Sequence, residues 1–307
     1  MQKHVLKTKS LSKEYKKIVA LENINISIKK GDIYGLIGEN GAGKTTLTRL
    51  ITGLIYQTNG EIELFEEREA SKLSKQRRRI GCIIESPVLY EDMTAKQNLE
   101  IIRVQRGIPG KGCIDEVLNL VNLPDTKSKK IKNFSLGMKQ RLALAIALLG
   151  DPEFLILDEP INGLDPIGII EFRELIKKLN REKKITILIS SHILSELHQL
   201  ATYYGIIHKG KLIEEISVEE LNERCKKHIN LEVDDSAKAS IILENNLKIK
   251  NFSVLPNNVI KIYDYLDRVK LISNELVSNG VGIERINTQG DGLEEYFTRL
   301  IGGNRNV

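Results

Sequence analysis

The sequence predicts an α/β protein in which residues 1–220 form a mostly parallel sheet covered by helices. Three observations lead to this fold class. Short apolar runs typical of buried strands alternate with stretches of helical spacing. One such run, Ile33–Ile37, is followed at once by a glycine-rich loop and a helical stretch. Another run, at 154–159, ends in two acids, which is typical of the edge of a parallel sheet where ligands bind.

The glycine-rich loop fits the phosphate-binding pattern G-x-x-x-x-G-K-S/T. Its residues are Gly38, Glu39, Asn40, Gly41, Ala42, Gly43, Lys44, Thr45 and Thr46. Glycines let backbone N–H groups approach a phosphate chain closely, and the helix that follows presents its N-terminus to the same anion. Lys44 can reach the β- and γ-phosphates, and the Thr45 hydroxyl can ligate Mg²⁺. We therefore expect a nucleoside triphosphate, with Mg²⁺, to bind here.

The other elements of residues 1–220 follow in chain order. We expect antiparallel strands within 5–30, a strand at 60–64, a buried strand at 80–85, helices within 94–123 and at 134–149, a strand at 154–159, a helix at 169–180 and a strand at 185–189. Tyr15 lies in the Lys-rich turn of the first strands, where an aromatic ring could stack on a purine base. A lone Tyr in a loop is, however, more often a surface residue.

Polar residues at the ends of two buried strands predict the catalytic groups. Asp158 would position Mg²⁺, and Glu159 would orient and deprotonate the water that attacks the γ-phosphate. His192 follows the strand at 185–189 and could hydrogen-bond the γ-phosphate. Acids and single histidines at strand ends are often structural, but here they share one sheet with the phosphate-binding loop.

Composition and charge restrict the class of protein. Three cysteines without metal-ligand spacing are typical of unpaired thiols in a reducing cytosol. The chain starts without an apolar signal segment, and its longest apolar run, Leu142–Leu149, is far shorter than the ~20 residues of a membrane span. Any membrane function would therefore need a separate subunit. The net charge of +5 is modest, and the basic clusters at 77–79 and 127–132 are typical of solvated faces, so we do not expect nucleic acid as a partner.

The character of the chain changes after residue 220. We expect a strand at 229–233, a helix at 236–244, a hairpin of strands at 249–255 and 259–263, a helix at 267–278, a strand at 281–287 and a helix at 292–301. The order β-α-β-β-α-β resembles the ferredoxin-like arrangement. Two interpretations stay open: a packing or dimer-stabilising appendage, and a regulatory domain that controls dimer closure.

With these motifs in order, residues 1–220 resemble the nucleotide-binding subunit of an ATP-binding cassette (ABC) transporter. The matching segments are Tyr15 at the adenine-stacking aromatic, Gly38–Thr45 at Walker A, Glu85 at the Q-loop, Ser135–Gln140 at the LSGGQ signature, Leu155–Glu159 at Walker B, Asn162–Asp165 at the D-loop and His192 at the switch histidine. The resemblance implies a P-loop NTPase cassette over residues 1–220, in which antiparallel β and helical subdomains (the latter about 86–145) accompany the parallel sheet. Residues 221–307 would form a small α+β accessory domain.

The resemblance also implies a head-to-tail dimer. Each ATP would lie between Lys44 of one subunit and the signature of the other, which consists of Ser135, Leu136, Gly137, Met138, Lys139 and Gln140. Leu136 replaces the first glycine of the family's signature. Ser135 and Gly137 still supply a hydroxyl, a backbone N–H and a helix N-terminus, so we expect ATP binding to survive. Asp165 would belong to the D-loop.

Glu85 stands where the family usually has glutamine. A carboxylate oxygen can still coordinate Mg²⁺, but it brings negative charge close to the phosphates. Our hypothesis is that Glu85, as a metal ligand and catalytic-site residue, alters the coupling between hydrolysis and the membrane subunit; the alternative is a harmless variant. Together with the signature Ser-Leu-Gly-Met-Lys-Gln, this glutamate resembles the bacitracin-export and lantibiotic-immunity branch of the family.

The implied function is a Mg²⁺-dependent ATPase that powers export or clearance of an antimicrobial peptide or drug through a separate permease. The subunit would be a cytoplasmic dimer, peripheral on the inner face of the cell membrane, and residues 86–105 would transmit its motion to the permease. One alternative is a non-transport ABC ATPase that acts on a soluble macromolecule, although such proteins usually carry two cassettes or a long coiled-coil insertion. The other is a non-hydrolysing regulatory subunit, which the presence of Lys44, Asp158, Glu159 and His192 disfavours.

Overall fold

The computed structural model describes residues 3–85, 88–123, 128–225, 227–289 and 293–302. The chain divides into two compact units, Met1–Val218 and Glu219–Val307. This division falls at the start of helix α8 (Val218–Cys225), beside the boundary after residue 220 that the sequence suggests. Each unit has a hydrophobic core of its own. Among the described residues, no helix combines the length and apolar character that crossing a bilayer requires.

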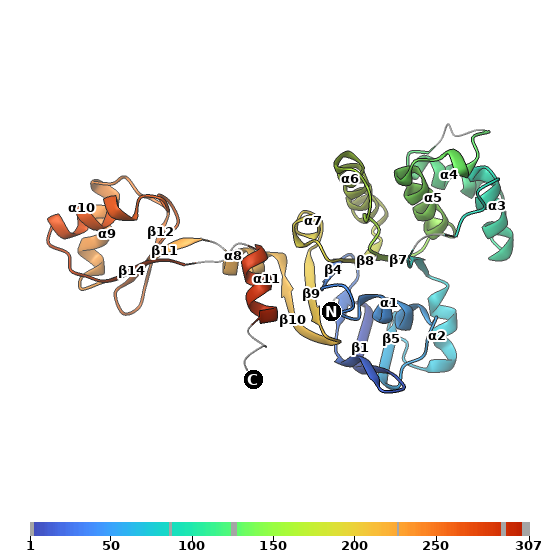
Figure 1. Ribbon diagram of the computed structural model, residues 1–307, viewed down its shortest axis with the longest axis horizontal. Helices are drawn as coiled ribbons and strands as arrows, with labels where there is room; N and C mark the ends of the chain where they lie inside the picture. The colour runs from blue at the N-terminus through green and yellow to red at the C-terminus, as the bar shows by residue number, and fades with distance from the viewer. Residues whose placement is uncertain (1–2, 86–87, 124–127, 226, 290–292, 303–307) are drawn as a thin grey trace. The chain divides into compact units, whose positions relative to one another are not determined.

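The first unit is built on a six-stranded sheet (Figure 1). Its strand order is β10 (Lys211–Ser217), β9 (Tyr203–His208), β4 (Ile33–Ile37), β8 (Thr186–Ser191), β7 (Phe154–Asp158) and β6 (Ile80–Ile83). All neighbours are parallel except the edge pair β10–β9. Every residue of β4, β7 and β8 is buried, because a parallel sheet is covered on both faces. The predicted mostly parallel sheet is confirmed.

A second, antiparallel sheet covers this core at the N-terminal end of the chain. It consists of β2 (Ile18–Ile24), β1 (His4–Tyr15) and β3 (Ser27–Lys29), with β5 (Asn59–Leu64) also paired to β1. Leu6 and Leu11 of β1 are fully buried and belong to the same hydrophobic cluster as Leu47 and Ile51 of helix α1 (Lys44–Thr52). The antiparallel strands therefore hold α1 against the parallel sheet.

Three helices form a group beside the sheet, at the upper right of Figure 1. They are α3 (Ala95–Gln105), α4 (Gly112–Leu120) and α5 (Leu136–Leu148). Thr94 and Gln97 form a capping box at the start of α3, which satisfies free N–H groups at that terminus. A 3₁₀ turn, Ile131–Asn133, precedes α5, and helix α6 (Pro166–Lys183) follows β7.

The sequence pattern predicts no element in residues 193–227 or in the charged segment before residue 80. In the structure, residues 193–227 contain α7 (Leu194–His198), β9, β10 and α8. The charged segment before residue 80 contains α2 (Ala70–Arg77). Helix α7 has only five residues and α2 only one buried residue, Leu73, so neither carries a clear apolar period.

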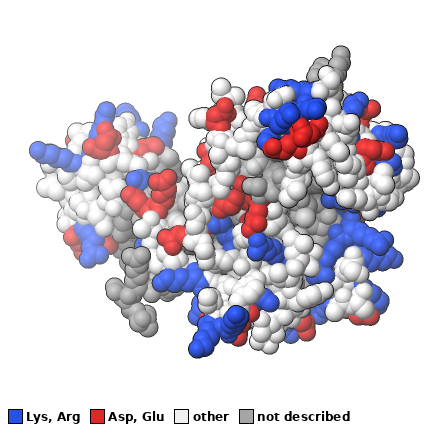
Figure 2. Space-filling model, turned by 45° about the vertical axis from the view of Figure 1, so that its right-hand side comes forward, with Lys and Arg blue, Asp and Glu red and all other residues white. Residues whose placement is uncertain are grey.

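The basic run 77–79 is only partly the solvated face that its charge predicts. Arg78 is exposed, but Arg79 forms an ion pair with Glu153 (2.7 Å) and its guanidinium lies 3.6 Å from the centre of the Phe65 ring. Arg77 donates a hydrogen bond to the Ile51 carbonyl (3.0 Å). Figure 2 shows acidic and basic side chains interspersed over much of the visible face, with one concentration of Lys and Arg on its right-hand part.

The second unit has the predicted order of elements. They are β11 (His228–Val233), α9 (Ser236–Asn245), β12 (Phe252–Leu255), β13 (Val259–Ile262), α10 (Val269–Ser278), β14 (Ile283–Gln289) and α11 (Leu293–Gly302). The strands form one antiparallel sheet in the order β12-β13-β11-β14, whose buried residues include Leu231 and Ile260. Assignment of this unit to the ferredoxin-like family stays a prediction.

A partly buried Tyr–Glu pair joins two strands of the first unit. The Tyr34 hydroxyl on β4 donates to Glu215 Oε1 on β10 (2.7 Å), which also accepts from the Ser27 backbone N–H (3.3 Å). Burial raises the pKa of Glu215 from its ordinary value of 4.5, and it raises the pKa of Tyr34 as well. The folded protein therefore keeps a proton on Glu215 at pH values where the unfolded chain has lost it.

We predict that this carboxyl makes the free energy of unfolding decrease as pH rises above 4.5 through the raised pKa. Glu215→Gln keeps an acceptor for the Tyr34 hydroxyl but removes the ionisation. The free energy of unfolding of this variant should therefore decrease less over the same pH range. Urea unfolding of both proteins at a series of pH values measures this, with Glu61→Gln, an exposed carboxylate, as control. Parallel curves for wild type and Glu215→Gln would contradict the prediction.

Candidate functional site

The glycine-rich loop joins β4 to α1 in a conformation that excludes larger side chains. A Cβ atom on Gly38 would lie 2.4 Å from the Ile207 carbonyl oxygen, and one on Gly43 would lie 2.6 Å from Leu21 Cδ2. Gly43, at φ 112°, is also in the left-handed region and precedes α1 as its N-cap. Because glycine offers no side chain to cap the helix, the first N–H groups of α1 are left for an anion.

Lys44 is buried and lies at the centre of the site. Its Nζ donates to the carbonyl oxygens of Gly38 (2.7 Å) and Glu39 (3.2 Å) and is 3.0 Å from Glu159 Oε1. The other carboxylate oxygen, Glu159 Oε2, is 2.9 Å from His192 Nδ1. The structure thus brings three of the predicted residues together, with Glu159 between the lysine and the histidine.

Asp158 is the last residue of β7 and has partners of its own. Its Oδ2 accepts from the Thr45 hydroxyl (2.6 Å) and its Oδ1 from the Ser190 hydroxyl of β8 (2.6 Å). A hydroxyl and a carboxylate oxygen side by side are the hard ligands that Mg²⁺ prefers, so these two residues fit the ion. The part of the chain that the structure describes contains no group of three His, Cys, Asp or Glu residues able to hold a metal. Phosphate and water oxygens would therefore have to complete a Mg²⁺ site.

Glu85 is held by a different partner. Its carboxylate forms an ion pair with Arg49 of α1, and its backbone adopts a left-handed conformation with φ 60°. The structure therefore places Glu85 with Arg49 rather than with Thr45 and Asp158, and its role as a metal ligand stays a prediction.

A cavity of about 400 Å³ lies beside the glycine-rich loop. It is lined by Ile18, Val19, Ala20, Asn40, Gly41, Gly43, Lys44, Thr45, Thr46, Glu159, Lys209 and Gly210. The sequence pattern does not single out the apolar residues of the β1–β2 hairpin, or Lys209 and Gly210, as part of the site. Their signal was weak: Ile18 and Val19 are exposed apolar residues (70% and 50%) in a Lys-rich turn.

Tyr15 does not line this cavity as the structure describes it. It pairs with Ile18 across the hairpin, 42% exposed, and the Lys13 ammonium lies 4.9 Å from the centre of its ring. Base stacking by Tyr15 stays a prediction.

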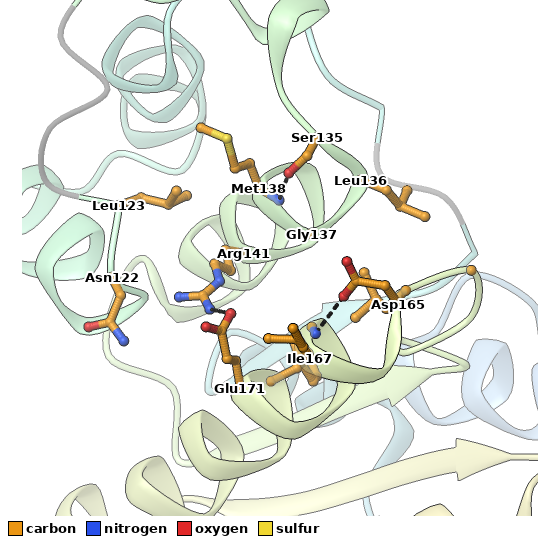
Figure 3. A pocket seen from close by; sticks show the side chains of 14 residues that line it. Asn122, Leu123, Ser135, Leu136, Gly137, Met138, Arg141, Asp165, Ile167 and Glu171 are labelled. Atoms are coloured by element: carbon orange, nitrogen blue, oxygen red, sulfur yellow. Dashed lines mark hydrogen bonds and ion pairs between the residues drawn. The ribbon is translucent and has the colours of Figure 1, made fainter.

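A larger cavity, about 800 Å³, lies between the start of α5 and the start of α6 (Figure 3). Ser135, Leu136, Gly137 and Met138 line it from one side, and Asp165 from the other. Both polar residues cap helices: Ser135 accepts from the Met138 N–H (3.3 Å) and Asp165 from the Gly168 N–H (2.6 Å). Leu136 is 46% exposed, so the residue that replaces the family's glycine is accessible to a partner.

Two signature residues, Lys139 and Gln140, turn toward their own subunit instead, although the buried Gln140 Oε1 has no hydrogen-bond partner among the described residues. Lys139 forms an ion pair with Glu91 (2.8 Å), and Gln140 is buried within the helical group. Across the cavity, Arg141 of α5 pairs with Glu171 of α6 (2.6 Å) and also donates to the Val121 carbonyl (3.2 Å). Figure 3 shows this pair spanning the gap between the two helices.

Known proteins are similar to this chain in sequence and in fold. A family model described as ABC transporter matches residues 21–162. The chain is 46% identical to a bacitracin transport ATP-binding protein of Bacillus licheniformis, covering 97% of this chain and 98% of that protein. It is 48% identical to a lantibiotic transport ATP-binding protein of Streptococcus pyogenes, over 68% of this chain and 89% of that one. Among solved structures, a dimeric post-hydrolysis state of the ATP-binding cassette MJ0796 bound to ADP and Pi matches with a TM-score of 0.63 and 27% identity, over 69% of this chain and 98% of that chain.

We predict that Gly38→Ala lowers both stability and nucleotide affinity, because the new methyl would meet the Ile207 carbonyl at 2.4 Å. Overpacking of this kind costs about 1–3 kcal/mol. Gly112→Ala is the matched control, since a Cβ there meets nothing within 4 Å. Thermal unfolding and titration with a fluorescent ATP analogue measure the two effects. Equal behaviour of the two variants would show that the loop tolerates the methyl group.

Proposed function

This chain belongs to the ABC transporter family of ATP-binding proteins, and we propose that it powers export of an antimicrobial peptide or drug of the bacitracin or lantibiotic type. The chain is an ATP-binding and hydrolysing subunit, as its family membership shows. The printed names of the two transport relatives support the substrate class, and the bacitracin relative matches over 97% of this chain. The observation that carries the catalytic part is the cluster of Lys44, Glu159 and His192 at one edge of the sheet.

We propose that Lys44 and the free N–H groups of α1 bind the β- and γ-phosphates of ATP. A buried lysine must keep an anionic partner, so a phosphate that binds Lys44 replaces Glu159 Oε1 as that partner. Glu159 is then free to act as general base toward a water molecule, while His192 holds its other oxygen and so orients the carboxylate.

Thr45 and Asp158 would hold Mg²⁺, and Ser190 would orient Asp158 through its hydrogen bond to Oδ1. When bound, the ion supplies charge stabilisation to the phosphates. Glu85 pairs with Arg49 instead, so this proposal does not include it among the ligands of the ion.

We further propose a homodimer in which the signature of one copy faces the phosphates bound by the other. Ser135, Gly137 and the N-terminus of α5 lie at an open cavity, as a site completed by a second copy requires. Asp165, across this cavity, would contact the partner too. The dimeric state named for the MJ0796 cassette supports this arrangement.

A separate permease would carry the substrate, and this subunit would lie on the cytoplasmic face of the membrane. Residues 86–105 would contact the permease; of these, Val88 and Tyr90 are exposed apolar residues (95% and 48%). Residues 1–220 would act as the ATPase domain and 221–307 as an accessory domain. No observation in the described residues or in the relatives favours the non-transport alternative.

We predict that Glu159→Gln lowers the rate of ATP hydrolysis by about 10²–10⁴-fold, because an amide cannot accept the proton of the attacking water. Nucleotide binding should persist, since Lys44 and the loop are unchanged. Phosphate release measures the first effect and titration with a fluorescent ATP analogue the second, with exposed Glu182→Gln as control. Hydrolysis by Glu159→Gln at the wild-type rate would refute the assignment of the base.

The transport proposal predicts a membrane partner and a phenotype. A tagged chain purified from detergent-solubilised membranes of its host should carry a polytopic membrane protein in about equal amount. Deletion of the gene should lower the concentration of bacitracin or of a lantibiotic that inhibits growth, with rescue by the wild-type gene but not by Glu159→Gln. A soluble or ribosomal partner without a membrane protein would contradict the proposal and leave the ATPase assignment intact.

A further inference from the structure

Glu85 and Glu159 occupy equivalent positions beyond two neighbouring strands. Strands β6 and β7 are parallel, and their register ends with Ile83 opposite Leu157. Each glutamate lies two residues past that pair, and each has a left-handed backbone, with φ 60° for Glu85 and 50° for Glu159. This conformation is uncommon for a residue with a long side chain. The edge of the sheet therefore presents two carboxylates in the same way, from strands about 4.8 Å apart.

Helix α1 supplies a separate cation to each of these carboxylates. Lys44, at its first position, lies 3.0 Å from Glu159 Oε1. Arg49, in its last turn, forms an ion pair with Glu85 Oε1 through its Nη2 atom. Thr45 of the same helix binds Asp158. Each of the three acids at this edge thus has a different partner side chain on the same helix.

Neither stability nor helix capping explains the Arg49–Glu85 pair. The side chains are 36% and 61% exposed, and ion pairs this exposed contribute little to stability. A cation in the last turn of α1 does interact favourably with the helix dipole, but that interaction requires no carboxylate partner. What the pair does determine is the location of the Glu85 carboxylate.

We propose that Arg49 is a positioning residue for Glu85, which it holds against α1 and away from Thr45 and Asp158. The proposal rests on the function proposed above, in which Thr45 and Asp158 bind Mg²⁺. Among the described residues, no three acids converge on a metal site, although Asp158 ends β7 and the two glutamates follow the adjacent strands β6 and β7. Arg49 therefore keeps a hard oxygen ligand and a negative charge out of the nucleotide site.

Loss of Arg49 would free that carboxylate, with two effects on nucleotide binding. Without metal, the uncompensated negative charge repels ATP and weakens its binding. With Mg²⁺, the free carboxylate offers the ion another oxygen ligand and offsets that loss. Both effects raise the ratio of the Kd for ATP in EDTA to the Kd in Mg²⁺. Both effects require the Glu85 carboxylate. A direct effect of the lost arginine charge on ATP binding would appear whether or not Glu85 is present.

The experiment is a double-mutant cycle on this ratio, which measures binding and not hydrolysis. Wild type, Arg49→Gln, Glu85→Gln and the double variant are titrated with a fluorescent ATP analogue in Mg²⁺ and in EDTA. We expect Arg49→Gln to raise the ratio roughly five-fold or more when Glu85 is present and to leave it unchanged in the Glu85→Gln background. Arg49→Lys should restore the wild-type ratio, since one charged contact is enough to hold the carboxylate.

The matched control is Arg68→Gln, which removes an exposed arginine that pairs with Glu63 outside the site. Thermal unfolding confirms that each variant is folded. An equal change of the ratio in both backgrounds, or no change in either, overturns the role of Arg49 and leaves the ATP site as proposed. Wild-type binding that does not respond to Mg²⁺ would instead contradict the proposed function itself.

Discussion

The buried ammonium group of Lys44 is the constraint on which the rest of the site depends. A charge taken out of water needs anionic or dipolar partners, and Lys44 has the carbonyls of Gly38 and Glu39 together with the Glu159 carboxylate. The carbonyls come from the loop itself and are always present. Glu159 is the exchangeable partner, because a phosphate can take its place. In the proposed function, nucleotide binding at Lys44 and release of Glu159, the proposed general base, therefore occur together.

Three other features of the fold serve this arrangement. The antiparallel sheet packs on α1 and holds it against the parallel sheet, so Lys44 and Thr45 face the strand ends. Full burial of β4, β7 and β8 leaves those ends as the place where polar groups emerge. Ser190, one strand from Asp158, then fixes the carboxylate that Thr45 also contacts.

The departures of this chain from its family's usual motifs have structural counterparts. Leu136 at the signature is accessible beside the cavity between α5 and α6, where glycine would leave the helix N-terminus bare. Glu85 has its own cation in Arg49, so the extra negative charge at the Q-loop is neutralised within the same subunit. In the proposed assembly Leu136 would face the second copy, and Glu85 directly precedes the segment 86–105 that would contact the permease.

The sequence by itself determined the features that contiguous residues encode. The glycine-rich loop, the buried strands around it, the acids after β7 and the element order of the second unit follow from local pattern, because periodicity and turn chemistry act over a few residues. Only the tertiary structure decided which groups meet. Arg49 pairs with Glu85 across 36 positions of sequence, and Ile18, Val19 and Lys209 line the cavity beside the glycine-rich loop. Such pairings depend on strand order and on the paths of connecting segments, which no local pattern records.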